Sequence, residues 1–340
     1  MASHAGVSFK TVSRVINGEG GVSEEMARRV DEAVAALGYQ LDHRARVLRS
    51  GEQRSSTIGF ILVDVSNQFF GSLLRGIEGV ASARQCLVFA ASTDRSAVRE
   101  RQLIEEFIRR RVDGLIIVYS GSDPMALRAE IERGTPTVFL DLEPEAVSAD
   151  IVRSDHYGGA RRVTEHLLSH GHRDIAFLGD DAKVYSATQR LAGYRDVMGA
   201  AAIAVPDTRI VTGSYDTDEW YARTYDLLCQ SSLPTALFTA QNIVTLGAVR
   251  ALHELELEHV VAQAGFDDVD LATAVRPPIT VVTQDPLQLG REAAERLFAR
   301  IDGDDSPPRQ LIFETPLIVR GSGELPPSST DAARNLGSAS

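Results

Sequence analysis

The sequence predicts a mixed α/β fold in which a small all-α segment precedes two α/β lobes with parallel sheets. Up to about Ser56 the chain shows helical periodicity without strand patterns. From Thr57 onward, short apolar runs alternate with amphipathic helical segments, and this alternation occurs in two successive sets. Strands separated by single helices form right-handed βαβ units, which build parallel sheets.

The composition is that of a globular protein with more than one domain. The chain has 340 residues, 44% hydrophobic and 24% charged, which is enough for two or three sizeable cores. No apolar run approaches the ~20 residues of a membrane span, and no basic-then-apolar signal segment is visible at the N-terminus. Cys86 and Cys229 have no CxxC spacing. We therefore expect a cytoplasmic protein with no membrane partner, metal or cofactor.

Two short helices joined by a tight turn are predicted near the N-terminus. Gly6 suits the left-handed cap that ends a helix, and Ser8 is a good N-cap for the next one. The second helix begins at Phe9 and carries a narrow apolar stripe. The stripe consists of Val12, Val15 and Ile16, and the opposite side carries Lys10, Ser13, Arg14 and Asn17. Such cations and polar groups suit base edges and phosphates in a major groove, although an ordinary surface helix has the same pattern.

The wording of this stretch closely resembles the DNA-binding headpiece of the lactose repressor/galactose repressor family. The match is carried by Ala5-Gly6-Val7-Ser8 and by Thr11-Val12-Ser13-Arg14-Val15-Ile16-Asn17-Gly18, and later matches extend to about residue 320. The resemblance implies a helix-turn-helix that binds double-stranded operator DNA, and a homodimer. The DNA contacts that it implies are Ser8, Phe9, Lys10, Thr11, Ser13, Arg14, Asn17, Ala45, Leu48 and Arg49.

The family's hinge helix is matched only in part. Ala45, Leu48 and Arg49 agree with its A-x-x-L pattern, whereas Leu41 and Asp42 replace the usual Pro-Asn. In the family this helix inserts a leucine into the minor groove, and apolar wedges of that kind kink DNA. We expect Leu48 to be this wedge. The alternative is that Leu48 is a helix-face leucine that packs on the body of the protein.

The first helix is expected to be incomplete. The family carries about eight more residues before the position of Met1, so the resemblance implies a truncated or mis-assigned start.

Charge is distributed in a way that fits a DNA-binding N-terminal segment. The chain has a net charge of −12, whereas residues 1–54 hold eight Lys and Arg against seven Asp and Glu. An acidic body repels DNA except where this segment meets it.

The resemblance also implies that the two lobes adopt the periplasmic sugar-binding-protein fold. Predicted strands are 58–63, 87–91, 115–118, 137–140, 175–178, 209–211, 236–239, 260–264 and 281–283, with closing strands near 311–313 and 317–319. Predicted helices are 70–84, 97–111, 124–133, 158–170, 187–201, 218–228, 243–255 and 287–301. We expect a headpiece at 1–49, a linker at 50–56, an effector and dimerisation domain at 57–325, and a disordered tail at 326–340. Within the effector domain, the first lobe covers about 57–153 and 286–314, and the second about 154–285 and 315–325.

Candidate ligand-binding residues follow the predicted strands, because ligands of open α/β sheets bind at the carboxyl ends of strands. In the first lobe they are Asp64, residues 67–70 with Phe69, Thr93, Asp94, Arg95 and Asp141. In the second lobe they are Arg190, Trp220, Asn242, Asp267 and Gln284. A sugar needs polar partners for neighbouring hydroxyls and an aromatic face for its C–H groups, and this set offers both.

The family pattern strengthens some of these candidates. It places Arg190 in R-x-x-G and Asp267 in G-F-D-D, two motifs that line the effector cleft in the family. Each residue also has a structural alternative when taken singly. Asp141 and Asp267 suit loop or cap positions, Arg190 suits a structural salt bridge, and Trp220 suits a core.

Catalytic patterns are absent from the sequence. It has no GxSxG, no GxGxxG after the first strand, no P-loop and no HExxH. His166, His170 and His172 cluster at a predicted helix end, where we interpret them as structural.

We predict a non-enzymatic, homodimeric transcriptional repressor controlled by a small sugar-like effector. The alternatives are a sugar-binding protein, a DNA-binding-deficient sensor, and an enzyme on the doubly wound fold.

Overall fold

A computed structural model describes residues 1–16, 20–37, 54–119, 134–142, 148–181, 184–213 and 216–328. The chain divides into two compact units, Met1–Ser56 and Thr57–Ser340. The fold class that the sequence predicts is confirmed, with an all-α first unit and two α/β lobes in the second. The predicted helix at 124–133 lies outside the described residues.

Among the described residues of the first unit, the helices α1 (Ala2–Ala5), α2 (Phe9–Ile16) and α3 (Glu24–Leu37) pack around one small core. Gly6 ends α1 in the left-handed conformation, with φ 63°, as predicted. The Oγ atom of Ser8 accepts a hydrogen bond from the Thr11 amide at 3.1 Å, which confirms the predicted cap at the start of α2. The buried core residues are Ala5, Val12, Val30 and Ala33.

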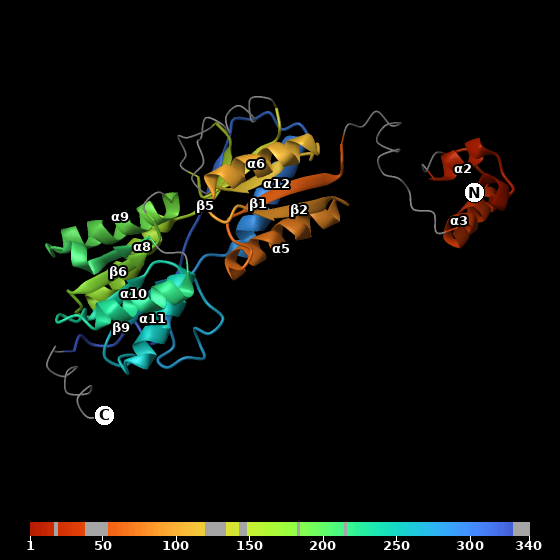
Figure 1. Ribbon diagram of the computed structural model, residues 1–340. Coiled ribbons are helices and arrows are strands. Elements are labelled where there is room, and N and C mark those ends of the chain that lie inside the picture. The colour runs from red at the N-terminus through yellow and green to blue at the C-terminus, as the bar shows by residue number, and fades with distance from the viewer. Residues whose placement is uncertain are drawn as a thin grey trace. The chain divides into compact units, whose positions relative to one another are not determined.

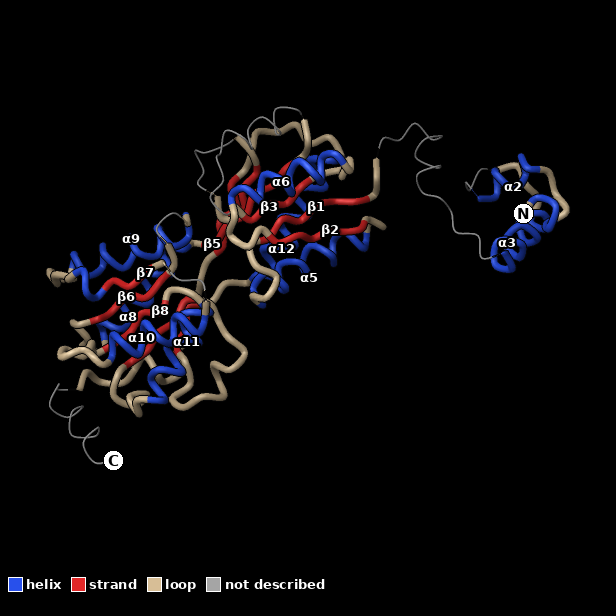
Figure 2. Tube along the Cα trace, in the orientation of Figure 1, coloured by secondary structure: helices blue, strands red, loops and turns tan. Residues whose placement is uncertain are grey.

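The second unit contains two six-stranded sheets, which form separate lobes (Figures 1 and 2). The first sheet has the order β11-β5-β4-β3-β1-β2 and is parallel throughout. Its strands are β1 (Thr57–Leu62), β2 (Leu87–Ser92), β3 (Leu115–Val118), β4 (Thr137–Leu140), β5 (Asp150–Ser154) and β11 (Gln310–Phe313). The second sheet has the order β12-β10-β9-β8-β6-β7, in which only β12 runs antiparallel to its neighbour. Its strands are β6 (Ile175–Gly179), β7 (Ile210–Thr212), β8 (Ala236–Thr239), β9 (Ala262–Phe266), β10 (Thr280–Val282) and β12 (Leu317–Ile318).

Helices cover both faces of each sheet, so each lobe has three layers (Figure 2). In the first lobe α5 (Gln68–Ala83) and α12 (Pro286–Ile301) cover one face and α6 (Ala97–Arg109) covers the other. In the second lobe α8 (His156–Ser169) and α9 (Tyr185–Ala200) oppose α10 (Thr217–Leu228) and α11 (Asn242–Glu254). The chain passes between the lobes after β5, before α12 and after β11.

Two expectations need correction. The sequence did not predict β5, because this strand opens with a charged residue and carries another inside it. Asp150 is 2% exposed and accepts hydrogen bonds from Arg300 at 2.6 Å and from the Arg309 amide at 2.8 Å, so its charge is balanced inside the lobe. Residues 326–328, expected in the disordered tail, contact the second lobe, where the Ser328 hydroxyl donates to the Val260 carbonyl.

None of the helices in the described ranges is long and apolar enough to cross a membrane.

Reciprocal glycines bring α5 and α12 into close contact. A Cβ added at Gly76 would lie 2.2 Å from the Leu287 carbonyl oxygen, and one added at Gly290 would lie 2.2 Å from the Leu73 carbonyl oxygen. Contact at this distance excludes any side chain. The two helices of the first lobe therefore pack backbone to backbone.

This packing predicts opposite outcomes for two glycines of the same helix. Gly76→Ala should lower the free energy of unfolding by about 1–3 kcal/mol, because the added methyl group forces the helices apart. Gly79→Ala should be neutral or stabilising by up to about 1 kcal/mol, since nothing lies within 4 Å of its added Cβ. Urea unfolding of both variants measures the difference, and equal effects would contradict the proposed helix contact.

Candidate functional site

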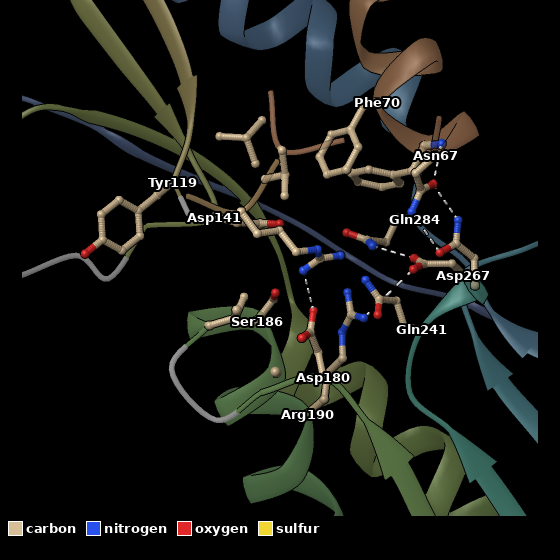
Figure 3. A pocket seen from close by; sticks show the side chains of 17 residues that line it. Asn67, Phe70, Tyr119, Asp141, Asp180, Ser186, Arg190, Gln241, Asp267 and Gln284 are labelled. Carbon is tan, nitrogen blue, oxygen red and sulfur yellow. Dashed lines mark hydrogen bonds and ion pairs between the residues drawn. The ribbon is translucent and has the colours of Figure 1, made fainter. Parts of the chain in front are cut away.

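A small cavity lies between the lobes, at the carboxyl ends of strands from both sheets (Figure 3). It encloses about 70 Å³. Nine of the fourteen candidate ligand-binding residues line it, namely Asn67, Phe69, Phe70, Arg95, Asp141, Arg190, Asn242, Asp267 and Gln284. The other five, Asp64, Gln68, Thr93, Asp94 and Trp220, are not part of this lining. The lining also includes residues outside that prediction, among them Tyr119, Asp180, Ser186 and Gln241. Polar groups from both lobes therefore converge on one space.

The first lobe contributes an aromatic wall at the start of α5. The side chain of Asn67 caps this helix by accepting a hydrogen bond from the Phe69 amide at 3.0 Å. The rings of Phe69 and Phe70 then meet edge to face, with centroids 5.5 Å apart. Asn67 and Phe70 were candidates because they follow the first predicted strand, and the structure places both in the lining.

Three of the lining residues have left-handed backbone conformations. Arg95, Asp141 and Asp267 have φ angles of 61°, 54° and 74°. Each directly follows the end of a strand or its first turn, in the loops after β2, β4 and β9. Non-glycine residues rarely adopt this region, and such strain is frequent at ligand sites.

The guanidinium group of Arg190 is the centre of a buried polar network. Its Nη1 atom donates to the Ala240 carbonyl at 2.6 Å, and its Nη2 atom donates to Nδ1 of His156 at 3.3 Å. The group also lies 3.9 Å from the ring centre of Phe266 and 3.9 Å from a carboxylate oxygen of Asp267. One side chain therefore connects the ends of β8 and β9 with the start of α8.

His156 extends this network into the first lobe. Because its Nδ1 atom accepts from Arg190, its proton lies on Nε2, which donates to Asp141 at 2.8 Å. Burial opposes the ionisation of Asp141, but its interactions with His156 and the charge of Arg190 lower the pKa of that carboxyl below its ordinary value. The sequence did not identify His156, which follows the unpredicted strand β5.

Asp180 has the opposite electrostatic environment. Burial raises the pKa of its carboxyl above the ordinary value, and the charge of Arg95 offsets only part of this effect. Nη1 of Arg95 lies 3.1 Å from Oδ2 of Asp180, and the two side chains come from different lobes. The sequence did not single out Asp180, although it follows the predicted strand at 175–178 directly.

Other polar contacts also bridge the lobes. The amides of Asn67 and Asn242 exchange two hydrogen bonds, at 2.7 and 3.2 Å. Gln68 donates to Asp270 at 3.4 Å. Direct side-chain contacts therefore occupy part of the space between the lobes, including the surroundings of the small cavity.

The structure corrects two of the predicted effector-binding residues. Trp220 is 0% exposed and packs in the core between α10 and α11, so it does not line the cavity. Its helix begins with Asp216 as N-cap, and the tryptophan side chain follows the apolar face of that helix into the lobe. Asp94 is exposed and outside the lining, where it accepts from Ser92 and pairs with Arg99 at 3.1 Å.

The clustered histidines make structural contacts. Nε2 of His172 bonds to the Leu325 carbonyl at 2.8 Å, and Nδ1 of His170 bonds to the His166 carbonyl at 2.9 Å at the end of α8. His166 pairs with Glu324. Within the described residues, no group of His, Cys, Asp or Glu side chains is arranged to hold a metal ion.

The outward face of α2 is a second candidate site, in the first unit. Ser8, Phe9 and Lys10 are exposed, with Phe9 at 75%, while Val12 is buried against the core. Thr11, Ser13 and Arg14 are half-buried on the same helix. Asn17, Ala45, Leu48 and Arg49 lie outside the described residues, and the DNA contacts of all ten predicted residues stay predictions.

The lowered pKa of Asp141 predicts a pH-dependent contribution to stability. A carboxyl whose folded pKa lies below its unfolded value stabilises the fold above that unfolded value, about 3.9, and loses this contribution as pH falls through the folded value. The stability advantage of the wild type over Asp141→Asn should therefore shrink as pH falls below about 4. Urea unfolding at a series of pH values measures it, with exposed Asp207→Asn for comparison. A constant or growing advantage would contradict the assignment.

Comparisons with known proteins cover both units of the chain. Residues 1–42 match the family described as "Bacterial regulatory proteins, lacI family", and residues 164–323 match the "Periplasmic binding protein-like domain". The ribose operon repressor of Haemophilus influenzae is 31% identical, over 95% of this chain and 97% of its own length.

Two solved structures extend the likeness to three dimensions. The structure named "transcriptional regulator CelR-cellobiose complex" is 30% identical with a TM-score of 0.72, covering 94% of this chain and 98% of that one. A lac repressor dimer bound to operator and the anti-inducer ONPF is 27% identical with a TM-score of 0.83, covering 95% and 97%. This chain therefore belongs to the lacI family of bacterial regulatory proteins and is a DNA-binding transcriptional regulator.

Proposed function

We propose that this protein is a repressor whose affinity for operator DNA is set by a small sugar-like effector in the cleft between the lobes. The observation that carries the proposal is the joint placement of Arg190, Asp267, Asn242 and Phe69 on one cavity. Operator DNA of a bacterium lies in the cytoplasm, so the proposed function implies a cytoplasmic protein. We assign a binding role to the cleft and no catalytic role.

The chemistry of the lining supports a polyhydroxyl ligand. Carboxylates and amides accept and donate hydrogen bonds at several points around the cavity, and Phe69 and Phe70 offer apolar ring surfaces. Relatives point in the same direction, because one is named a ribose operon repressor and another was solved with cellobiose. A monosaccharide or disaccharide is therefore the ligand class that we propose.

The cavity volume bears on how the effector acts. Ligand sites usually enclose about 300–1,000 Å³, so this cavity of about 70 Å³ is by itself small for a sugar. Binding would replace the cross-lobe contacts Arg95–Asp180 and Asn67–Asn242 with contacts to the ligand. If the effector binds one arrangement of the lobes more tightly than another, it shifts the population towards that arrangement. The affinity of the protein for operator DNA would change with this shift.

We propose that the protein is a homodimer that uses the edge strand β2. Leu87 and Phe89 point to the same side of β2 and are 66% and 44% exposed. A sheet edge with exposed apolar side chains is a common association surface. A dimer would also place two copies of α2 on two half-sites about one helical turn apart.

The dimer proposal predicts that charge at β2 separates the subunits. Phe89→Asp should give a monomer in sedimentation velocity, because it buries a carboxylate in the proposed interface. Ile312→Asp is the matched control, since Ile312 is 53% exposed on β11, the other edge of the same sheet. The proposal fails if Phe89→Asp stays dimeric, or if both variants dissociate equally.

The DNA-binding proposal predicts the effect of two substitutions on α2. Lys10→Ala and Arg14→Ala should each weaken operator binding by about 1–3 kcal/mol, the range of a good base contact. Arg28→Ala is the control, because Arg28 lies on α3 and pairs with Glu25 and Glu32. Gel-shift titration at fixed salt measures all three, and unchanged affinity in both α2 variants would remove the recognition-helix assignment.

The effector proposal predicts a contrast between residues inside and outside the cavity. Asp267→Asn and Arg190→Lys should each weaken effector binding by about 1.5–3 kcal/mol, the value of a hydrogen bond to a charged group. Asp94→Asn should leave it unchanged, because Asp94 does not line the cavity. Calorimetric titration with ribose and cellobiose is the measurement. Wild-type affinity in the first two variants would show that those residues are structural.

A further inference from the structure

The charges around the cleft do not balance. Among the described residues, the cavity lining carries the carboxylates of Asp141, Asp180 and Asp267 and the guanidinium groups of Arg95 and Arg190. His156 adds no charge, because its Nδ1 atom accepts a hydrogen bond from Arg190. The described lining therefore has an excess of one negative charge.

Both arginines are already engaged by protein groups. Arg190 donates to the Ala240 carbonyl and to His156, with Asp267 3.9 Å away. Arg95 pairs with Asp180 at 3.1 Å, and their side chains are only 18% and 8% exposed. An incoming anion would therefore meet two cations whose charge is largely neutralised, next to carboxylates that repel it.

Unpartnered polar atoms in the lining indicate the same preference. Oε1 of Gln284 and Oε1 of Gln241 are buried without a hydrogen-bond partner, and Gln284 is 8% exposed. The amide nitrogen of Gln284 donates to Asp267 at 2.5 Å, which leaves its oxygen as the open group. One donor, Nε of Arg190, is likewise unpartnered. The described lining thus offers a ligand more open acceptors than donors, so the ligand has to donate hydrogen bonds.

The neighbouring cavity adds no compensating cation. It encloses about 330 Å³ and shares Phe69, Asn242, Asp267 and Gln284 with the first cavity. It adds Asp268 and Asp270 as acids and Arg320 as its described base, and Arg320 binds Asp268 through both of its terminal nitrogens.

We propose that the cleft selects an uncharged, hydroxyl-rich ligand and rejects phosphorylated or carboxylated sugars, and that Asp180 sets this selection by neutralising Arg95. The proposal rests on the proposed function and names the ligand class for the same site. A hydroxyl group can insert between Arg95 and Asp180 and bond to both, because it accepts from one and donates to the other. A doubly ionised phosphomonoester brings only acceptors and further negative charge.

The first test uses inorganic phosphate as the probe on the full chain. Thermal unfolding is followed with increasing phosphate against chloride at equal ionic strength. The wild type should show no specific stabilisation, whereas Asp180→Asn should bind phosphate at least about tenfold more tightly, because the charge of Arg95 then loses its Asp180 partner. Asn keeps the oxygen that accepts from the Asp181 amide, so the local turn is retained.

Two further variants isolate the site. Asp94→Asn also removes one negative charge next to Arg95, but Asp94 does not line the cavity. This variant should therefore behave as the wild type. Adding Arg95→Met to Asp180→Asn should abolish the gained phosphate binding. Equal phosphate binding in the wild type and Asp180→Asn would overturn the proposal, and so would a gain that survives the loss of Arg95. Asp180→Ser provides a second test if the Asn variant does not fold.

The second test compares ribose with ribose 5-phosphate and glucose with glucose 6-phosphate by calorimetry. The wild type should bind the phosphorylated form of its preferred sugar at least about 100-fold more weakly than the neutral form. Binding of the phosphorylated form alone would overturn the charge selection while leaving the proposed sugar-controlled regulator in place. If the protein binds none of these sugars, neutral or phosphorylated, and does not bind cellobiose either, the result would count against the proposed function. The phosphate test would still decide the role of Asp180.

Discussion

The buried guanidinium group of Arg190 is the interaction on which the cleft depends. It bonds to the Ala240 carbonyl and to His156, and it lies on the ring of Phe266, so it joins the ends of two strands to the start of a helix. His156 passes the connection to Asp141 in the other lobe. A buried charge requires this number of partners, since an unpaired guanidinium would carry a large desolvation cost. The arrangement therefore positions several lining residues at once.

The contacts across the cleft are polar, which distinguishes them from the apolar cores within each lobe. Arg95 with Asp180 and Asn67 with Asn242 are pairs that a polar ligand can replace group by group. Replacing one hydrogen-bonded partner with another costs little, whereas separating two apolar surfaces would expose them to water. The lobes are thus joined by contacts suited to rearrangement, while each lobe stays rigid through its own core and, in the first lobe, through the close contact of α5 with α12.

Charge has separate roles in the two units. The acidic composition of the second unit agrees with an acidic cleft and disfavours contact with DNA away from the headpiece. The small first unit presents Lys10 and Phe9 on an exposed helix face, held by a core of only a few apolar residues. Recognition of DNA and recognition of a small molecule are therefore assigned to surfaces of different charge on one chain.

The sequence by itself determined the fold class and most strands and helices. Most of the residues that it predicted for the cavity do line it. The sequence could do so because strand and helix periodicities are local, and because parallel strands bring the residues after them to one edge. Gly6 and Ser8 were equally local signals, since a left-handed cap and a side-chain N-cap need only neighbouring residues. The family resemblance added Arg190 and Asp267, whose motifs have a recognisable wording.

Tertiary structure alone decided the rest. Strand β5 escaped prediction because Asp150 is balanced by arginines far along the chain, and His156 was missed with it. Trp220 was placed in the cleft by sequence and lies in a core instead, because the rotation of α10 against α11 decides which way its side chain points. The pairing of Arg95 with Asp180 joins residues 85 positions apart in different lobes. Periodicity carries no information on such pairs, because they depend on how two separately folded sheets face each other.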